Sequence, residues 1–279
     1  MQSNNPVFRN NEGFSKPSYN AYGNATYAGN GAAHEGFGAG QTYGYAPSAT
    51  GPMTVDSVVQ KSAITIGAVV VAAIVTWLMT PDVTGRNVDL APLSAALVLG
   101  GGIAFVLSLV NSFKRNISPA LVIAFALAEG VALGAFSKLI DGVYGGGLVV
   151  NAVLGTFAAF AGTLAAYKYF HIRVGQKFRT FVVAAVFGMV GLSILELVLG
   201  MFGASLGLFG FGGLGILTAL AGLVLGIFML ILDFDQVEVG VANRLPDSES
   251  WRAAFGLTVS LVWIYTNLLR LMAILSNNG

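Results

Sequence analysis

The chain has 279 residues, of which 55% are hydrophobic and only 10% are charged, and its formal net charge is +1. Its mean hydropathy of +0.75 excludes an ordinary water-soluble domain, in which roughly 25% of the residues are charged. The balanced charge gives no basic footprint for nucleic acid. The absence of cysteine excludes disulfides, thiolate metal sites and cysteine nucleophiles.

Residues 1–52 differ in composition from the rest of the chain. They are rich in Asn, Gly, Ala, Ser and Tyr and show neither the period of a strand nor that of a helix. They also lack the apolar region of a secretory signal peptide. We predict a disordered cytoplasmic tail. Its tyrosines either bind a partner or, as we favour, make no specific contacts.

The remainder, residues 53–279, contains seven long apolar runs, and we predict one transmembrane helix for each. A short amphipathic helix capped by Thr54 is expected just before the first run, over residues 55–61. About 20 apolar residues cross a bilayer as a helix, and the runs are too continuously apolar for barrel strands. The predicted fold is an all-α integral membrane protein, a seven-transmembrane helical bundle. The runs are 62–80, 92–110, 119–139, 147–166, 181–201, 213–232 and 253–275.

Two pairs of glycines lie four residues apart within these runs. They are Gly130 with Gly134 and Gly222 with Gly226. Small residues at this spacing let helix backbones approach closely in a membrane. In a chain with 37 glycines, chance explains either pair equally well.

The basic residues predict the orientation of the bundle. If the N-terminus lies inside, eleven of the 14 Lys and Arg residues fall in inner segments, Arg86 and Lys138 fall in outer loops, and Arg270 lies within the last span. The positive-inside rule then places the N-terminus in the cytoplasm and the C-terminus outside the cell membrane. We expect the basic loop 167–180 to lie at the inner surface, against lipid headgroups.

Ionisable residues within the spans are candidate functional groups, because a charge in hydrocarbon is costly. Glu129 lies near the middle of the third span without an oppositely charged partner at its depth, so we expect it to be protonated. It either holds helices together or binds a proton or ion. Glu196 and Arg270 fall at similar depths in spans that run in the same direction, which predicts an intramembrane ion pair. We favour a structural pair near the outer interface, or an Arg270 that reaches the interface alone, over a role of the pair in transport.

Three carboxylates, Asp233, Asp235 and Glu238, directly follow the sixth apolar run. In a helix Asp235 and Glu238 share a face, while Asp233 points elsewhere. Carboxylates this close repel one another, which makes them sensitive to pH or to a cation, and oxygen ligands suit a hard cation such as Ca²⁺. The alternative is a solvated acidic helix end at the cytosolic surface.

No resident metal or cofactor is assigned to the chain. The loop pattern of an EF-hand is missing. His34 and His171 are far apart in the sequence, and neither has a second histidine at ligand spacing.

Four stretches of the chain resemble the Bax inhibitor-1/YccA-like family of membrane proteins, most closely its bacterial branch. The resemblance covers residues 50–277 and implies a seven-helix fold with the sixth and seventh helices at its centre. It also implies a pH-sensitive leak of Ca²⁺ across the membrane, and it associates eukaryotic relatives with the suppression of cell death. The stretches are NPVFR from Asn5, MTV from Met53, SPALVIAFALAEGVALGAFS from Ser118, and DFDQVEVGVANRLPDSESWRAAFGLTVSLVWIYTNLLRLMAIL from Asp233.

The resemblance also implies a sensor residue. In the family, a carboxylate in an FDTQ-like stretch of the sixth helix pairs with an aspartate of the last helix. A proton shared by the two carboxylates opens or closes the path of the ion across the membrane. The residues 234–236, Phe-Asp-Gln, match the first half of this pair, so the resemblance gives Asp235 the role of sensor, with Asp233 beside it.

The second half of the pair is missing, because the last helix contains no carboxylate. Trp263 stands at the matching position, and the nearest polar residues are Thr266 and Asn267. A latch would then join Asp235 to Asn267, to one of its two acidic neighbours, or to a carboxylate of another span. Glu129 is our second choice of sensor.

We therefore expect a pH-sensitive cation leak channel, gated by carboxylate protonation, with Ca²⁺ as the transported ion. The alternative is a non-transporting protein that binds and regulates other integral membrane proteins, which the tyrosine-bearing tail and the glycine-lined helix faces favour. An enzyme is not expected, because the sequence has no HExxH motif, no evident GxGD-like aspartate pair and no Ser–His arrangement. The expected partners are the lipid bilayer and, in the alternative, other membrane proteins.

Overall fold

The computed structural model describes residues 51–83, 90–145, 147–210 and 212–277. The predicted tail up to residue 50, with its tyrosines and His34, and the loop residue Arg86 lie outside the described residues.

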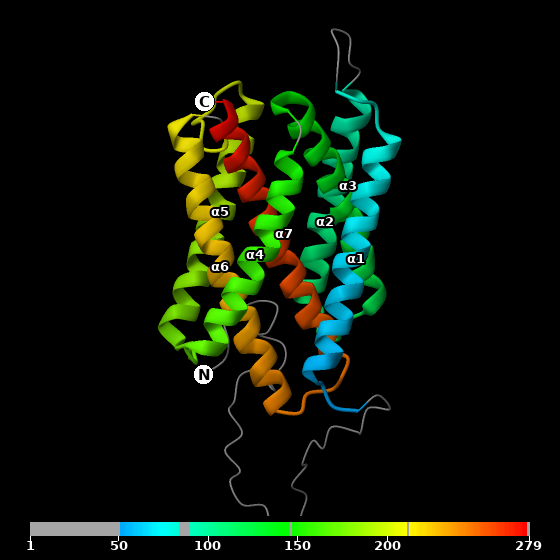
Figure 1. The fold of residues 1–279 in the computed structure, drawn as a ribbon, viewed down its shortest axis with the longest axis vertical. Coiled ribbons are helices and arrows are strands. Elements are labelled where there is room, and N and C mark those ends of the chain that lie inside the picture. The colour runs from blue at the N-terminus through cyan, green and yellow to red at the C-terminus, as the bar shows by residue number, and fades with distance from the viewer. Residues whose placement is uncertain (1–50, 84–89, 146, 211, 278–279) are drawn as a thin grey trace, which may run out of the picture.

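Seven helices follow one another in the described chain and run alternately up and down (Figure 1). Each is long and apolar enough to cross a membrane. The predicted all-α, seven-helix fold is confirmed. The helices are α1 (Val55–Met79), α2 (Ala91–Phe113), α3 (Pro119–Tyr144), α4 (Leu148–Tyr169), α5 (Gln176–Met201), α6 (Gly213–Ala242) and α7 (Glu249–Asn277).

Several helices extend well beyond the apolar runs that predicted them. The short helix expected over residues 55–61 is the first part of α1. Thr54 caps it, since the Thr54 hydroxyl accepts from the Ser57 amide and the Ser57 hydroxyl accepts from the Thr54 amide, each at 3.1 Å. α6 continues to Ala242, so the three carboxylates after residue 232 lie on a helix rather than beyond its end.

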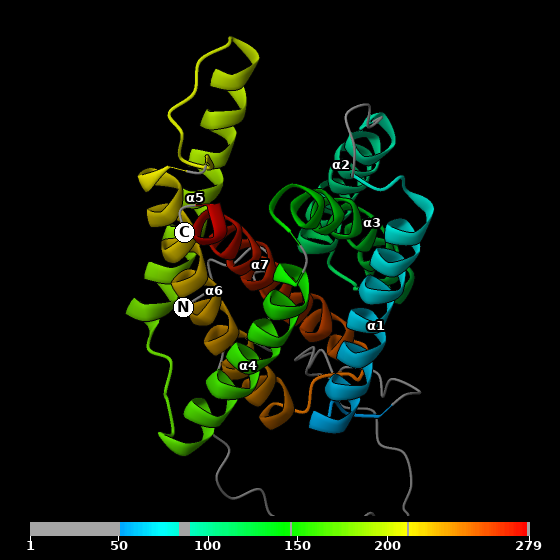
Figure 2. The same ribbon diagram turned by 45° about the horizontal axis from the view of Figure 1, so that its top comes forward.

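The last helix, α7, is the centre of the bundle and packs against α1, α3, α4 and α6. Figure 2 shows it crossing the middle of the molecule, with α5 and α6 on one side and α1, α2 and α3 on the other. α5 lies at the edge, packs against α6, and buries only one of its residues, Val182. A shift of α6 relative to α7 therefore changes the packing at the centre of the fold.

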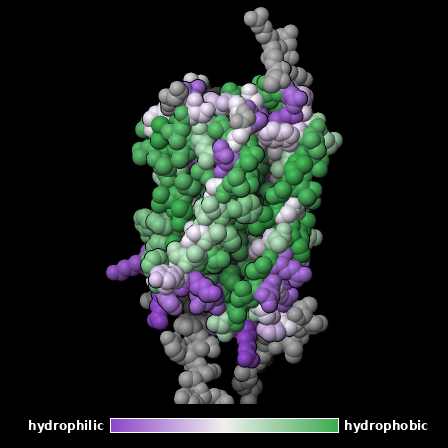
Figure 3. All heavy atoms as spheres, viewed as in Figure 1, coloured by the Kyte–Doolittle hydropathy of each residue, from purple (hydrophilic) through white to green (hydrophobic). Residues whose placement is uncertain are grey.

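The surface has a broad apolar belt between two polar ends (Figure 3). α1, α3, α5 and α7 begin at the same end of the bundle. We call this the basic end, because most of the described Lys and Arg residues lie there, and we call the other the opposite end. The members of the basic end are Lys61, Lys114, Arg115, Lys168, Arg173, Lys177, Arg179, Arg244 and Arg252.

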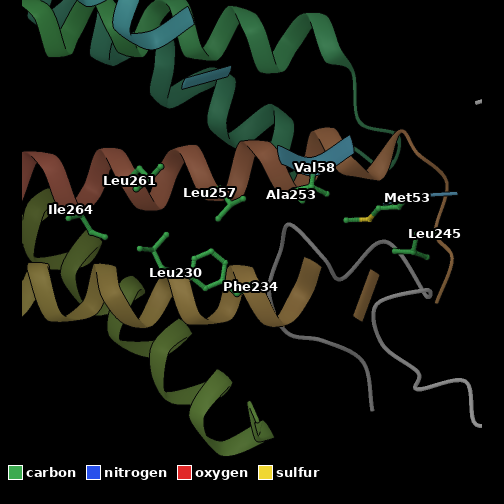
Figure 4. Close-up of a cluster of buried hydrophobic side chains, with 9 residues drawn as sticks. All are labelled: Met53, Val58, Leu230, Phe234, Leu245, Ala253, Leu257, Leu261 and Ile264. Carbon is green, nitrogen blue, oxygen red and sulfur yellow. The ribbon is translucent and has the colours of Figure 1, made fainter. Parts of the chain in front are cut away.

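At the basic end, the segment before α1 is attached to the loop between α6 and α7. The Met53 amide donates to the Leu245 carbonyl at 2.6 Å, and both side chains are buried in a cluster with Phe234 and Leu257 (Figure 4). The ammonium of Lys61 donates to the Asp247 carboxylate at 2.6 Å. The start of the membrane domain is thus held to its last two helices.

The ion pair between Lys61 and Asp247 predicts that the free energy of unfolding decreases in acid. Burial alone would raise the pKa of Asp247, but hydrogen bonds from Lys61 and Ser57, together with the Lys61 charge, hold this pKa below its usual value. A lowered pKa stabilises the folded state above the unfolded pKa of about 3.9, and this stabilisation is lost as the pH falls through the folded pKa. We expect Asp247→Asn to lower the free energy of unfolding at pH 7 by up to about 1 kcal/mol.

Thermal unfolding of the detergent-solubilised protein at a series of pH values measures this effect. The curves of Asp247→Asn and the parent should converge only when the pH falls below the folded pKa of Asp247, which lies under its usual value of about 3.9, because the parent carboxyl is then neutral too. Asp56→Asn is the control, because Asp56 is exposed at the start of α1. Curves for Asp247→Asn and the parent that stay parallel into acid would show that the ion pair does not contribute.

Candidate functional site

Asp233 lies in the interface between α6 and α7. Its carboxylate accepts a hydrogen bond from the Ser260 hydroxyl at 2.5 Å. One turn earlier on α7, a Cβ added at Gly256 would lie 3.1 Å from the same carboxylate. Gly256 therefore leaves the space in which Asp233 reaches Ser260, and the charge-bearing group is enclosed by the two helices rather than directed into water.

Asp235 and Glu238 point to other neighbours, as the helical spacing predicts. The Asp235 carboxylate accepts from the Arg179 guanidinium of α5 at 2.8 Å, and the two side chains are only 15% and 19% exposed. Asp235 also accepts from the backbone amide of Val174. The Glu238 carboxylate accepts from the Tyr167 hydroxyl of α4 at 2.7 Å. These contacts attach the end of α4, the loop after it and the start of α5 to α6.

Arg179 is the partner of Asp235 that the sequence analysis missed, because it was counted among the residues of a solvated basic loop. The partners expected for Asp235 were Asn267, its two acidic neighbours or a carboxylate of another span, and Arg179 is none of these. The spacing of residues in α5 could have indicated this partner, because Arg179 precedes the buried Val182 by three residues in the same helix. Residues three apart share a helix face, so the basic residue aligned with the buried side chain faces α6.

Glu129 is separate from the carboxylates of α6. Its neighbours one turn away on α3, Ala126 and Leu133, pack against Val262 and Tyr265 of α7, and residues at this spacing share a helix face. Within the described chain, no ion pair or hydrogen bond involves the Glu129 carboxylate. Glu129 and Asp233 therefore lie on opposite sides of α7, and α7 carries any coupling between them.

The predicted ion pair between Glu196 and Arg270 is wrong. Glu196 accepts from the Ser205 hydroxyl at 2.7 Å and from the Gly207 amide at 3.0 Å, and so closes the turn after α5. Arg270 donates to the Thr218 hydroxyl of α6 at 2.6 Å. Similar depth in the membrane does not bring two side chains together, and α5 packs on α6 rather than on α7.

Trp263 bonds α7 to Gly222 of α6, far from Asp235, and the Asn267 side chain lies beside the same glycine. The Trp263 indole donates to the Gly222 carbonyl at 2.8 Å, and the Asn267 amide donates to the Trp263 carbonyl at 2.8 Å. Gly222 and Asp235 are about 20 Å apart along α6, at about 1.5 Å per residue. Asn267 is therefore not the partner of Asp235, and the position given to an aspartate by the resemblance holds a packing side chain.

Lys138, which we expected in an outer loop, lies within α3 and is buried. Its ammonium donates to the carbonyl of Trp77 at 2.7 Å and to that of Thr80, and it forms an ion pair with Asp82 at 3.0 Å. A cation at a helix C-terminus satisfies carbonyls that lack helical partners. Lys138 thus closes the end of α1 and has a structural role.

The carboxylates do not form a ready-made metal centre in the described part of the chain. No group of three or more His, Cys, Asp or Glu residues there has the arrangement needed to hold a metal ion. Each acidic side chain of α6 has its own partner from a different helix. The arrangement is suited to changing helix contacts when a proton is gained or lost, and less to storing a cation.

Seven membrane-crossing helices around a central last helix, with acidic side chains bonded between helices, define a helical-bundle integral membrane protein. Residues 5–277 match the model of the family described as Bax inhibitor 1 like. The chain belongs to this family, as its sequence resemblance implied. A comparison with curated proteins gave no match.

Proposed function

We propose that this protein is a pH-sensitive cation leak channel, with Ca²⁺ as the transported ion and Asp235 as the protonated sensor. The observation that carries the proposal is the ion pair between Asp235 and Arg179, which joins α6 to α5 and is 15% to 19% exposed. A proton on Asp235 would remove the charge attraction, because a neutral carboxyl does not attract a guanidinium as a carboxylate does. α5 and the loop before it would then be released from α6.

Asp233 extends this proposal toward the centre of the bundle. It is two residues from Asp235 on α6 and bonds to Ser260 of α7. A small movement of α6 that follows the loss of the Asp235 contact would change the Asp233 contact with α7. Glu129, on the far side of α7, is the second carboxylate that we propose to respond to protons. Packed helices shift between discrete arrangements, so a local loss can become a change of state.

The charge distribution supports a proposed orientation and location. We place the protein in the cell membrane as a multi-pass protein with its basic end in the cytoplasm, on the positive-inside rule. We propose no resident cofactor and no enzymatic activity. In this orientation Asp235 and Arg179 respond to cytoplasmic pH.

Calcium flux into vesicles that contain the purified protein tests the gating role. Asp235→Asn imitates the protonated state, so we expect its flux at neutral pH to exceed that of the parent by roughly fivefold or more, the usual range of coupling between two states. Arg179→Gln removes the same ion pair from its other side and should have a similar effect. The double variant should add little to either single change, because all three remove one interaction.

Asp56→Asn serves as the control in the flux experiment, because it removes an exposed carboxylate at the same end of the bundle. Flux of Asp235→Asn and Arg179→Gln that matches the parent at every pH would remove Asp235 as the sensor. Parent vesicles that leak no more calcium than empty vesicles would contradict the channel itself.

The second candidate is a non-transporting protein that binds other integral membrane proteins. It is favoured by α5, which buries only Val182 and exposes apolar side chains such as Phe181, Phe187 and Leu197. A partner helix could cover this face, although lipid satisfies it equally well. Recovery of a stoichiometric membrane-protein partner, with no calcium flux from the pure protein, would support this candidate over the channel.

A further inference from the structure

A groove of about 470 Å³ lies along the side of the bundle between α1 and α4. Its walls come from these two helices, and its floor comes from α3 and α7. α1 and α4 stand apart in Figures 1 and 2, with α7 visible behind them. The groove therefore faces sideways, into the apolar belt that lipid would cover.

The groove has the depth of one leaflet. On α1 its lining residues begin at Ile66, near the middle of the helix, and end at Leu78, next to its last residue. At about 1.5 Å per residue this is roughly 18 Å, a little more than half of a hydrocarbon core of about 30 Å. The groove thus belongs to the leaflet at the opposite end of the bundle.

The body of the groove offers nothing to a polar ligand. It is lined mainly by Val, Ile, Leu and Phe side chains. Its hydroxyl residues Ser137, Thr156 and Thr258 each donate to the carbonyl four residues earlier in their own helix. Their hydrogen-bonding capacity is used internally, so an apolar chain can lie along the groove without leaving a donor unpaired.

One end of the groove carries a negative charge. Asp141 lines it near the end of α3, and within the described residues its carboxylate has neither an ion pair nor a side-chain hydrogen bond. The nearest base along the helix, Lys138, is already bonded to Asp82 and to the end of α1. The ring of Tyr265 also lines the groove, and aromatic faces attract ammonium groups.

We infer that this groove binds one membrane lipid of the leaflet at the opposite end, with an acyl chain along the groove and an ammonium headgroup beside Asp141. The Asp141 carboxylate at the end of the apolar walls favours a lipid over an apolar helix of a second protein, because an ammonium headgroup joined to an acyl chain matches both features of the groove. Binding of an acyl chain follows from the apolar walls, and the choice of headgroup follows from the charge.

Native mass spectrometry of the detergent-purified full chain, with equal amounts of phosphatidylethanolamine and phosphatidylglycerol added, tests this site. We expect one retained lipid per chain, with a roughly two- to fivefold preference for phosphatidylethanolamine, the range of a partly exposed ion pair. Val153→Trp places a large side chain in the groove and should abolish retention. Val106→Trp is its control, because Val106 is exposed on α2 and does not line the groove.

The headgroup contact has its own test. Asp141→Asn should keep the retained lipid but lose the preference for phosphatidylethanolamine, whereas Asp56→Asn at the basic end should lose neither. Equal retention by Val153→Trp and Val106→Trp would overturn the site, and so would a preference unchanged by Asp141→Asn. A dimer that Val153→Trp dissociates would assign the groove to a second copy instead and would also overturn the inference.

Discussion

Arg252→Ala is expected to lower the free energy of unfolding by about 3–5 kcal/mol, the cost of removing one partner from a buried charge pair. Arg252 is fully buried, and its guanidinium donates to the Glu249 carboxylate at 2.7 Å. It also donates to the Arg115 carbonyl at 2.9 Å, beyond the end of α2. The substitution leaves the buried Glu249 carboxylate without this partner and removes the contact between α7 and the loop after α2.

Thermal or denaturant unfolding in detergent, followed by circular dichroism, measures this loss. Arg115→Ala is the matched control, because it removes an exposed positive charge from the same place but keeps the carbonyl that Arg252 binds. Arg252→Lys should recover only part of the stability, since an ammonium cannot reproduce the fork of the guanidinium. Equal stability of Arg252→Ala and Arg115→Ala would show that the buried contacts contribute nothing net.

The helices were predictable because the length of an apolar run is a property of the sequence alone. The length of the apolar run also predicted that the sixth helix ends at residue 232, whereas α6 continues to Ala242. The charged residues after position 232 indicate an end, yet Phe234, Val237 and Val241 recur at helical spacing and pack into one cluster, so one face of the helix continues to Ala242. Packing of that face, which the mean hydropathy of a run does not measure, keeps the helix intact.

The partners of the charged residues were mostly not predictable. Sequence position gives the depth of Glu196 and Arg270 in the membrane but not the direction in which each side chain points around its helix. Asp235 was identified as a candidate sensor from the resemblance, while its contact with Arg179 depends on how a loop folds back on α6. The roles of Lys138 and Arg252 likewise require knowledge of which helix ends lie beside them.

Gly134→Ala is expected to destabilise the protein by about 1–3 kcal/mol, as overpacking of a well-packed interface does. A Cβ at Gly134 would lie 2.4 Å from the backbone carbonyl oxygen of Ala73 on α1, and one at Gly130 would lie 2.4 Å from that of Val69. The glycine pair therefore sets the distance between α1 and α3, as the four-residue spacing suggested. A backbone carbonyl cannot rotate away, so the two helices would have to separate.

Substitutions at two other glycines test whether contact with backbone causes the destabilisation expected for Gly134→Ala. A Cβ at Gly222 would also meet a neighbour, at 2.3 Å, but that neighbour is the Asn267 side chain, which can change rotamer. Gly222→Ala should therefore cost less than Gly134→Ala. Gly67→Ala, on α1 with open space around it, should be neutral or stabilising by up to about 1 kcal/mol. Unfolding midpoints that place Gly134→Ala level with Gly67→Ala would mean that α1 and α3 are not held at backbone contact.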